Sequence, residues 1–460
     1  GATGQILTAG ATRFAVSGDA NATFKVDNAG TIVGQVAFQS RDDLYVLRDD
    51  GKQTGQVTGG AGTDVFEFAL GTGKSRTFGS GAVVNLVTFS GFETVRKSGA
   101  GELVSTGTLD GTVGLVDVQG GTFVNQGTIA AQAGRQVLMS GDATTLFNAN
   151  GADLAAPIVA AAGSGQRQSI FNEGTITGSI DLGDGDDFVS NRGTITGDVN
   201  LGDGNDSVAW WVTQNASGQA NGTVLGQFSG GNGVDSLLIA IDEGQSRRMT
   251  NRQDLQPAGA PTGFEGVGKA GGGTLTWRFD GPPLDTQALR VMGGTLVLDS
   301  AVNVNMSAPG ATDGSGLLQI DAAGSTLQNN STLFVGKRLE MRADQTTLIN
   351  TGTITVADGT GQITGDGNRQ TIDNAGTITA GVSLGGGNDL YILRDSGIQN
   401  GLVDGGTGND VFQFDVANLA APRSFTGRDL VNFETVRKTG AGTLTFTGTL
   451  DPGVALVDVQ

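Results

Sequence analysis

The chain has 460 residues, of which 79 are glycine, and its 27 basic and 46 acidic side chains give a net charge of −19. It contains no cysteine and no histidine, which excludes disulfides, thiolate-bound iron–sulfur clusters, zinc sites with nitrogen and sulfur ligands, and Ser-His-Asp catalysis. The negative charge repels phosphate backbones, so we expect no nucleic-acid partner.

The motif Asn-x-Gly-Thr-Ile recurs along the chain, often at intervals of about 20 residues. It begins at Asn28, Asn125, Asn172, Asn191, Asn350 and Asn374. Asn and Gly tolerate the left-handed backbone of a sharp corner, and alternating Thr and Ile are typical of a strand with one buried face. The period predicts a solenoid of short parallel strands with roughly 23 coils. We expect Thr to face outward, Ile to stack in the core, and Asn to stack on Asn.

A longer repeat of about 170 residues lies over the short one. Its clearest segment, Phe-Glu-x-Val-x-Lys followed by a glycine-rich turn, occurs at residues 92–101, 264–273 and 433–442. We predict one continuous β-solenoid over residues 1–460, with approximate super-repeats 1–119, 120–290 and 291–460. The third copy ends where the first continues into another coil, so we expect the chain to be a fragment of a longer protein.

The Phe-Glu-x-Val-x-Lys segment carries an acid and a base four positions apart. The pairs are Glu93 with Lys97, Glu265 with Lys269, and Glu434 with Lys438. Residues i and i+4 of a strand lie on the same face. We therefore expect surface ion pairs that contribute little energy.

Acidic glycine-rich turns occur in pairs about one coil apart, at residues 182–187 with 201–206 and at residues 384–389 with 405–410. A weaker version covers residues 59–64, and a single one covers residues 230–235. Calcium takes six to eight oxygen ligands from carboxylates and carbonyls, which such turns can present. The alternative is that these residues simply favour a turn. The predicted calcium ligands are Asp184, Asp186, Asp187, Asp203, Asp206, Asp389, Asp404 and Asp410.

These turns resemble the Gly-Gly-x-Gly-x-Asp nonapeptides of RTX β-rolls, whose loops bind calcium, although RTX nonapeptides run in tandem. The coils as a whole resemble the passenger region of an autotransporter or a related large repetitive adhesin of Gram-negative bacteria. This second resemblance rests on Gly-, Thr- and Asn-rich coils without cysteine and spans nearly the whole chain. It implies an all-β, single-stranded, right-handed parallel β-helix on the cell surface, with an outer-membrane translocation apparatus outside this fragment as a partner.

Three functions follow as expectations. The first is a non-enzymatic extracellular adhesin or structural stalk for cell-surface or cell–cell attachment, whose partners are a surface receptor, a glycan or a second copy of the rod. The second is a calcium-binding, RTX-like secreted or surface-layer protein. The third and weakest is a β-helical polysaccharide-degrading enzyme, in which Asp187 and Asp206 on neighbouring coils stand about 5 Å apart. A catalytic site is normally singular, whereas these turns repeat, so we expect no enzymatic activity.

Overall fold

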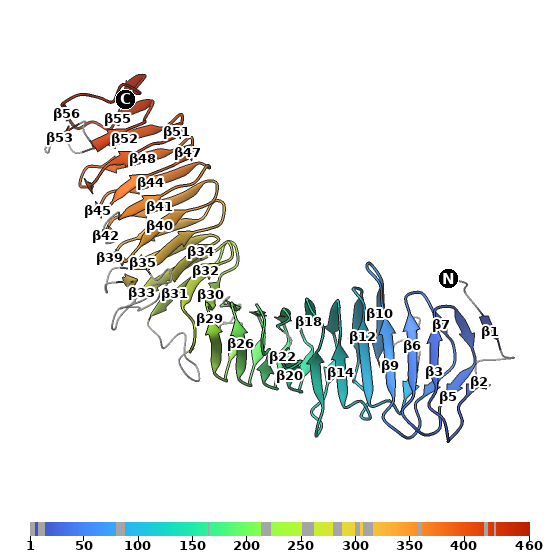
Figure 1. The fold of residues 1–460 in the computed structure, drawn as a ribbon. Helices are drawn as coiled ribbons and strands as arrows, with labels where there is room; N and C mark the ends of the chain where they lie inside the picture. Colours follow the sequence, from blue (N-terminus) through green and yellow to red (C-terminus); the bar gives the residue numbers. More distant parts are fainter. Residues whose placement is uncertain are drawn as a thin grey trace. The chain divides into compact units, whose positions relative to one another are not determined.

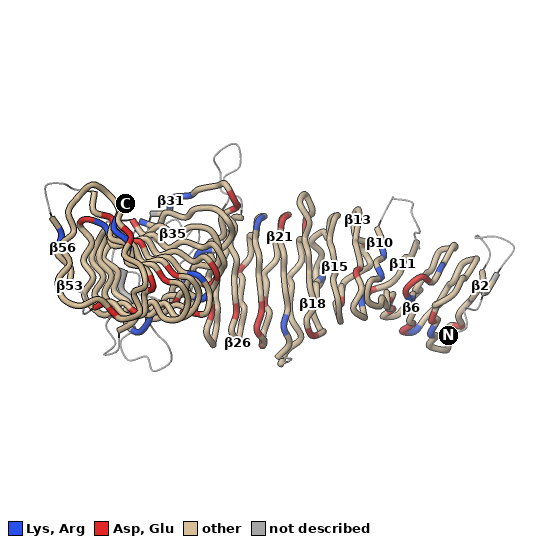
Figure 2. Tube along the Cα trace, turned by 90° about the horizontal axis from the view of Figure 1, so that it is seen from above, with Lys and Arg blue, Asp and Glu red and all other residues tan. Residues whose placement is uncertain are grey.

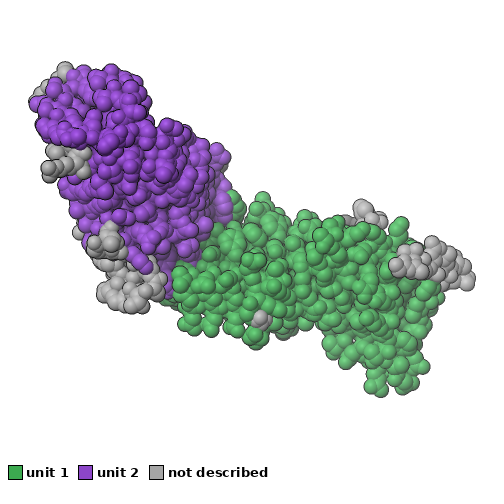
Figure 3. Space-filling view, turned by 45° about the horizontal axis from the view of Figure 1, so that its top comes forward, with its two compact units in different colours: residues 1–210, 219–235, 257–264 green, residues 211–218, 236–256, 265–460 purple. Residues whose placement is uncertain are grey.

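The structure is a computed structural model that describes residues 5–7, 14–79, 88–163, 165–212, 222–250, 262–278, 288–299, 304–306, 316–356, 361–417, 422–426 and 429–460. Over these residues it forms a β-solenoid of about 18 turns, with parallel coils about 21 residues apart (Figure 1). No helix among the described residues is long and apolar enough to cross a membrane. The chain divides into two compact units (Figure 3): residues 1–210, 219–235 and 257–264 form unit 1, and residues 211–218, 236–256 and 265–460 form unit 2.

Unit 1 stacks its strands into parallel sheets. The largest sheet consists, in order, of β29 (Phe228–Gly233), β26 (Val199–Gly204), β23 (Ile180–Asp181), β20 (Ile158–Ala160), β17 (Gln136–Met139), β14 (Leu115–Val118), β12 (Thr94–Ser98), β9 (Val65–Ala69), β6 (Leu44–Arg48) and β3 (Lys25–Asn28). A second consists of β10 (Ser75–Gly79), β13 (Glu102–Thr106), β15 (Thr122–Asn125), β18 (Thr144–Asn148), β21 (Gln168–Asn172), β24 (Phe188–Asn191) and β27 (Ser207–Trp211). Three shorter sheets consist of β16 (Thr128–Ile129), β19 (Asp153–Leu154), β22 (Thr175–Ile176), β25 (Thr194–Ile195) and β28 (Thr223–Val224); of β11 (Phe89–Ser90), β8 (Val57–Thr58), β5 (Gln35–Ala37) and β2 (Phe14–Ser17); and of β1 (Gln5–Leu7), β4 (Thr31–Val33) and β7 (Lys52–Gln53).

Unit 2 is built in the same way. Its largest sheet consists of β31 (Ser246–Thr250), β33 (Thr274–Arg278), β35 (Thr295–Asp299), β38 (Thr326–Asn329), β41 (Thr346–Asn350), β44 (Gln370–Asn374), β48 (Leu390–Arg394), β52 (Val411–Asp415), β55 (Thr435–Thr439) and β57 (Leu456–Val459). A second consists of β30 (Ser236–Ala240), β32 (Gly266–Ala270), β34 (Ala288–Met292), β37 (Leu317–Ile320), β40 (Arg338–Met341), β43 (Gln362–Thr364), β46 (Gly381–Ser383), β50 (Val403–Asp404) and β54 (Leu430–Val431). The shorter sheets consist of β36 (Val304–Met306), β39 (Thr332–Val335), β42 (Thr353–Val356), β45 (Thr377–Thr379) and β49 (Ile398–Asn400); of β47 (Gly386–Gly387) with β51 (Thr407–Gly408); and of β53 (Arg423–Thr426) with β56 (Leu444–Thr447).

The predicted all-β parallel solenoid is confirmed, whereas its right-handed sense and the super-repeat boundaries stay predictions. The expected number of coils, roughly 23, is too high because the coils are unequal. Equivalent residues lie 19 positions apart between Asp187 and Asp206, but 29 positions apart between Asp206 and Asp235. Longer coils use more residues per turn, so fewer coils fit into the chain.

The core confirms the expected alternation of the Thr-Ile motif. Strands β22 and β25 pair Thr175 with Thr194 and Ile176 with Ile195. The apolar column of this sheet is at most 1% exposed at every step, whereas the two threonines remain partly exposed. The column consists of Ile129, Leu154, Ile176, Ile195 and Val224. Burying each of its larger side chains contributes about 1.5–3 kcal/mol.

Asparagines of the same motif, together with Asn148 at the equivalent position of a coil that lacks the motif, stack on one another inside the corner, as predicted. The Asn148 side-chain amide donates to Asn172 Oδ1 at 2.8 Å, and the Asn172 amide donates to Asn191 Oδ1 at 2.8 Å. Each amide also donates to a backbone carbonyl, which for Asn172 is that of Thr194 at 3.2 Å. In unit 2 the amide of Asn350 donates to Asn374 in the same way. A buried amide is stable only with such partners, so these ladders hold neighbouring coils in register.

We predict that Asn172→Ala destabilises unit 1 by about 1–3 kcal/mol, because it removes one of the two acceptors of the buried Asn148 amide and the amide that donates to Asn191 Oδ1. The measurement is the thermal midpoint, followed by far-UV circular dichroism. Asn150→Ala, at an exposed position, is the matched control and should leave the midpoint unchanged. Equal midpoints for the two variants would contradict a structural role of the asparagine ladder.

Candidate functional site

The acidic glycine turns bury one aspartate at the same place in successive coils. In unit 1 the backbone N–H of Gln168 donates to Asp187 Oδ1 at 2.6 Å. The N–H of Asp187 donates to Asp206 Oδ1 at 2.6 Å, and the N–H of Asp206 donates to Asp235 Oδ1 at 2.7 Å. Each carboxyl group therefore satisfies a backbone N–H of the preceding coil. We call such a row an acidic ladder.

Two further acidic ladders have the same geometry, and each ends on a glutamate. In unit 1, Asp43 accepts from the N–H of Phe24 at 2.6 Å, Asp64 accepts from Asp43 at 2.7 Å, and Glu93 accepts from Asp64 at 2.8 Å. In unit 2, Asp389 accepts from the N–H of Gln370 at 2.7 Å, Asp410 accepts from Asp389 at 2.8 Å, and Glu434 accepts from Asp410 at 2.7 Å. The three ladders thus place a carboxyl group at equivalent positions in both units.

The expected surface pairs of Glu93 with Lys97 and of Glu434 with Lys438 are wrong. Glu93 comes directly before β12 and ends an acidic ladder instead of sharing a strand face with Lys97. Lys97 is fully buried, and its ammonium group donates to backbone carbonyls. The sequence spacing did not predict that Glu93 and Glu434 belong to the acidic ladders. They follow the preceding aspartate by 29 and 24 residues instead of by one regular coil.

Burial sets the electrostatics of the ladders. Asp187, Asp206, Asp389 and Asp410 are each at most 2% exposed, and their second carboxyl oxygens, Oδ2, are buried without a hydrogen-bond partner. Desolvation disfavours the charged form of a carboxyl group. It raises the pKa of Asp187 and Asp389 to about 7 and that of Asp206 to about 6, against the lowering effect of the backbone N–H donors. It also raises the pKa of Asp64 and Asp410.

The other four predicted calcium ligands lie nearer the surface. Asp186 is exposed and accepts from the backbone N–H of Asn205 at 2.8 Å. Asp203 accepts from the side-chain amide of Asn232 at 2.8 Å, and Asp404 accepts from that of Asn432 at 2.8 Å. Asp184 is half-buried at a bridge between neighbouring turns. The side chains of Asp186, Asp203 and Asp404 therefore link adjacent turns by hydrogen bonds.

Among the described residues, the predicted calcium ligands do not gather into one cluster of side chains. Within the described parts of the chain, no group of three or more acidic side chains could hold a metal. Calcium needs six to eight oxygens around one point, whereas the buried ladder carboxyl groups are spread along the stack, one per coil. Calcium binding by these residues stays a prediction.

Asp187 and Asp206 do sit on neighbouring coils, as the weaker enzymatic expectation requires. However, they are only 2% and 1% exposed, and each holds a backbone N–H. A polysaccharide chain cannot reach carboxyl groups at this depth. Their geometry fits a structural role better than that of a glycosidase pair.

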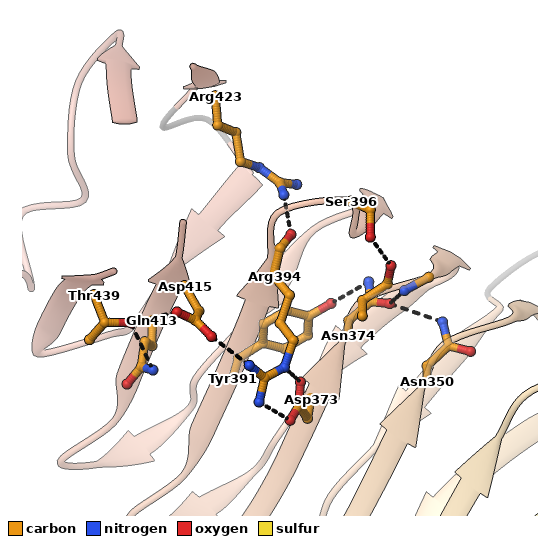
Figure 4. Close-up of polar contacts among 12 residues, drawn as sticks. Asn350, Asp373, Asn374, Tyr391, Arg394, Ser396, Gln413, Asp415, Arg423 and Thr439 are labelled. Atoms are coloured by element: carbon orange, nitrogen blue, oxygen red, sulfur yellow. Dashed lines mark hydrogen bonds and ion pairs between the residues drawn. The ribbon is translucent and has the colours of Figure 1, made fainter. Parts of the chain in front are cut away.

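Lys, Arg, Asp and Glu residues recur along the coils (Figure 2), and some of their side chains form ion pairs between neighbouring coils. In unit 2, Arg394 lies between Asp373 and Asp415 on adjacent strands, and its contact with Asp373 is 2.6 Å long (Figure 4). In unit 1, Arg48 contacts Asp27 at 2.6 Å at the matching position of the repeat. Such partly exposed pairs contribute about 0–1 kcal/mol each, so their main effect is to pattern the surface.

We predict that the acidic ladders make the protein less stable as the pH rises from 5 to 7.5. The folded pKa values of Asp187, Asp206 and Asp389 exceed the unfolded value of about 3.9, so the folded state binds more protons in this range and loses stability as they dissociate. The chain has no histidine, so no side chain with an ordinary pKa titrates between pH 5 and 7.5. The measurement is the thermal midpoint against pH in EDTA.

Asp187→Asn keeps the acceptor oxygen for Gln168 and removes the charge, so it should reduce this pH dependence. Asp186→Asn removes an exposed neighbouring charge, which raises the pKa of Asp187 less than burial does, so it should reduce the dependence less than Asp187→Asn. A wild-type midpoint that stays constant or rises between pH 5 and 7.5 would be inconsistent with this account of the ladders.

No family model, characterised protein or solved structure matches this chain.

Proposed function

We propose that this chain is part of a non-enzymatic extracellular surface protein of a Gram-negative bacterium, which acts as an adhesin or a structural stalk in cell-surface or cell–cell attachment. The observation that carries this proposal is that the same side-chain arrangements recur at matching positions in both units. A spacer built by duplication has this property, whereas an enzyme active site is normally present once.

The recurrence extends from the surface into the core. Outside, the pair of Arg48 with Asp27 in unit 1 matches the pair of Arg394 with Asp373 in unit 2. Inside unit 1, Tyr45 donates its hydroxyl to Gln53 Oε1 at 3.1 Å and accepts from the amide of Asn28 at 3.1 Å. In unit 2, the Tyr391 hydroxyl donates to Gln399 Oε1 at 2.6 Å, again next to the motif asparagine. Repetition of this kind supports a role in extension and repeated contact.

The partners that suit such a repetitive solenoid are a surface receptor, a glycan or a second copy of the chain, and an outer-membrane translocation apparatus during export. The net charge of −19 argues against a nucleic-acid partner. The calcium-dependent alternative is less well supported, because the acidic side chains are already engaged within or between turns. The enzymatic alternative is the least supported, because its carboxyl pair is buried.

We expect this chain to be accessible on intact cells of its source bacterium. Antibodies against the fragment should label those cells, and mild protease treatment should remove the label while a periplasmic marker protein is spared. Labelling that requires permeabilised cells would contradict surface display.

We also expect the purified fragment to compete with attachment. Added to the cells, it should lower their adherence to a surface or to each other, whereas the same fragment unfolded by heat should not. No release of reducing ends from acidic polysaccharides is expected. Release of such products that is lost in Asp187→Asn would instead support the enzymatic alternative.

A further inference from the structure

Each unit contains a fully buried lysine whose strand neighbours are buried apolar residues. Lys97 on β12 pairs in register with Phe68 on β9 and with Val118 on β14, both of which are buried. In unit 2, Lys269 on β32 pairs with Ile239 and Val291. Both lysines have 0% exposure. A charge in such a column is costly unless polar groups surround its end.

Backbone carbonyls of the glycine turns supply those groups. The ammonium group of Lys97 donates to the carbonyl oxygens of Ser98 at 3.0 Å, Gly99 at 2.6 Å and Gly120 at 2.8 Å. Gly99 has a φ of +76°, a left-handed conformation that favours glycine. Because Gly120 belongs to the next coil, one ammonium group links two successive turns. We call this set of oxygens the carbonyl cage.

The cage recurs in unit 2. Lys269 donates to the carbonyl oxygen of Gly271 in its own turn and to that of Gly293 in the next coil, the latter at 2.6 Å. A Cβ atom added at Gly294 would lie 2.2 Å from the Gly273 carbonyl oxygen and 2.3 Å from the Lys269 ammonium nitrogen, so this close approach favours glycine. Lys438, in the third copy of the motif, donates to the carbonyl of Gly440 and is only half-buried.

We infer that this glycine turn is a cation site made of backbone carbonyl oxygens, which the chain fills with the ammonium group of its own lysine, and which accepts a free ammonium-type cation when that group is removed. Carbonyl oxygens that converge on one point are ligands for a small cation. Burial lowers the pKa of Lys97 and Lys269 to about 8, so both side chains still carry a charge at neutral pH. This inference is independent of the proposed function.

The test is chemical rescue of Lys97→Met. Methionine keeps most of the apolar stem and removes the charge, so the carbonyl oxygens lose their donor. We expect the thermal midpoint at pH 7 to fall by about 2–10 °C. Ammonium chloride should restore part of this loss, whereas tetramethylammonium chloride at the same ionic strength should not, because that ion is too large and donates no hydrogen bond.

Lys74→Met is the matched control. Lys74 is partly exposed and contacts Asp50 at 2.5 Å, so its substitution should change the midpoint little and create no specific response to ammonium. A Lys97→Met variant as stable as wild type, or one that responds equally to both salts, would overturn the inference. If Lys97→Met does not fold, the same comparison on Lys269→Met, at the second cage, decides the question in the same way.

Discussion

The solenoid depends on hydrogen bonding of the backbone groups that its glycine turns leave inside the protein. A buried N–H or C=O group without a partner costs about 1–3 kcal/mol, and a solenoid repeats that cost in every coil. Three kinds of side chain meet this demand. Asparagine side chains such as that of Asn172 donate both to a neighbouring side chain and to a backbone carbonyl. The carboxyl groups of the acidic ladders accept hydrogen bonds from backbone N–H groups. Buried lysines such as Lys97 donate to backbone carbonyls.

The asparagines, the acidic ladders and the buried lysines all link one coil to the next. Because these contacts are local, the same arrangement can recur along the chain. In a solenoid each coil contacts only its neighbours. A side chain that hydrogen-bonds the buried backbone groups of one turn can therefore do the same in every copy of that turn. The acidic ladder that ends on Glu93 in unit 1 and the one that ends on Glu434 in unit 2 are such copies. Many polar groups of the described turns are used internally, so under the proposed function recognition would fall to outward side chains such as Arg48 and Arg394.

The candidate site was only partly predictable. The 19-residue interval between Asp187 and Asp206 correctly placed the two side chains on adjacent coils, because both turns belong to coils of equal length. Spacing alone did not reveal that these side chains point inward and accept backbone N–H groups instead of collecting around an ion. The sequence spacing did not predict Glu93 and Asp235 as members of the acidic ladders, because each follows the preceding aspartate by 29 residues. Lys97 was expected in solvent because strand alternation says which residues share a face but not which face is buried.

The sequence by itself determined the parallel coil, the inward Ile, the outward Thr and the stacking of Asn on Asn. These follow from a short period and from identical residues in neighbouring coils, which place like on like without any knowledge of distant contacts. Only the tertiary structure decided the number of coils, the partners of the carboxyl groups and the burial of the lysines. Each of these depends on how coils of unequal length come into register, and that register is set by stacking in space and not by distance along the chain.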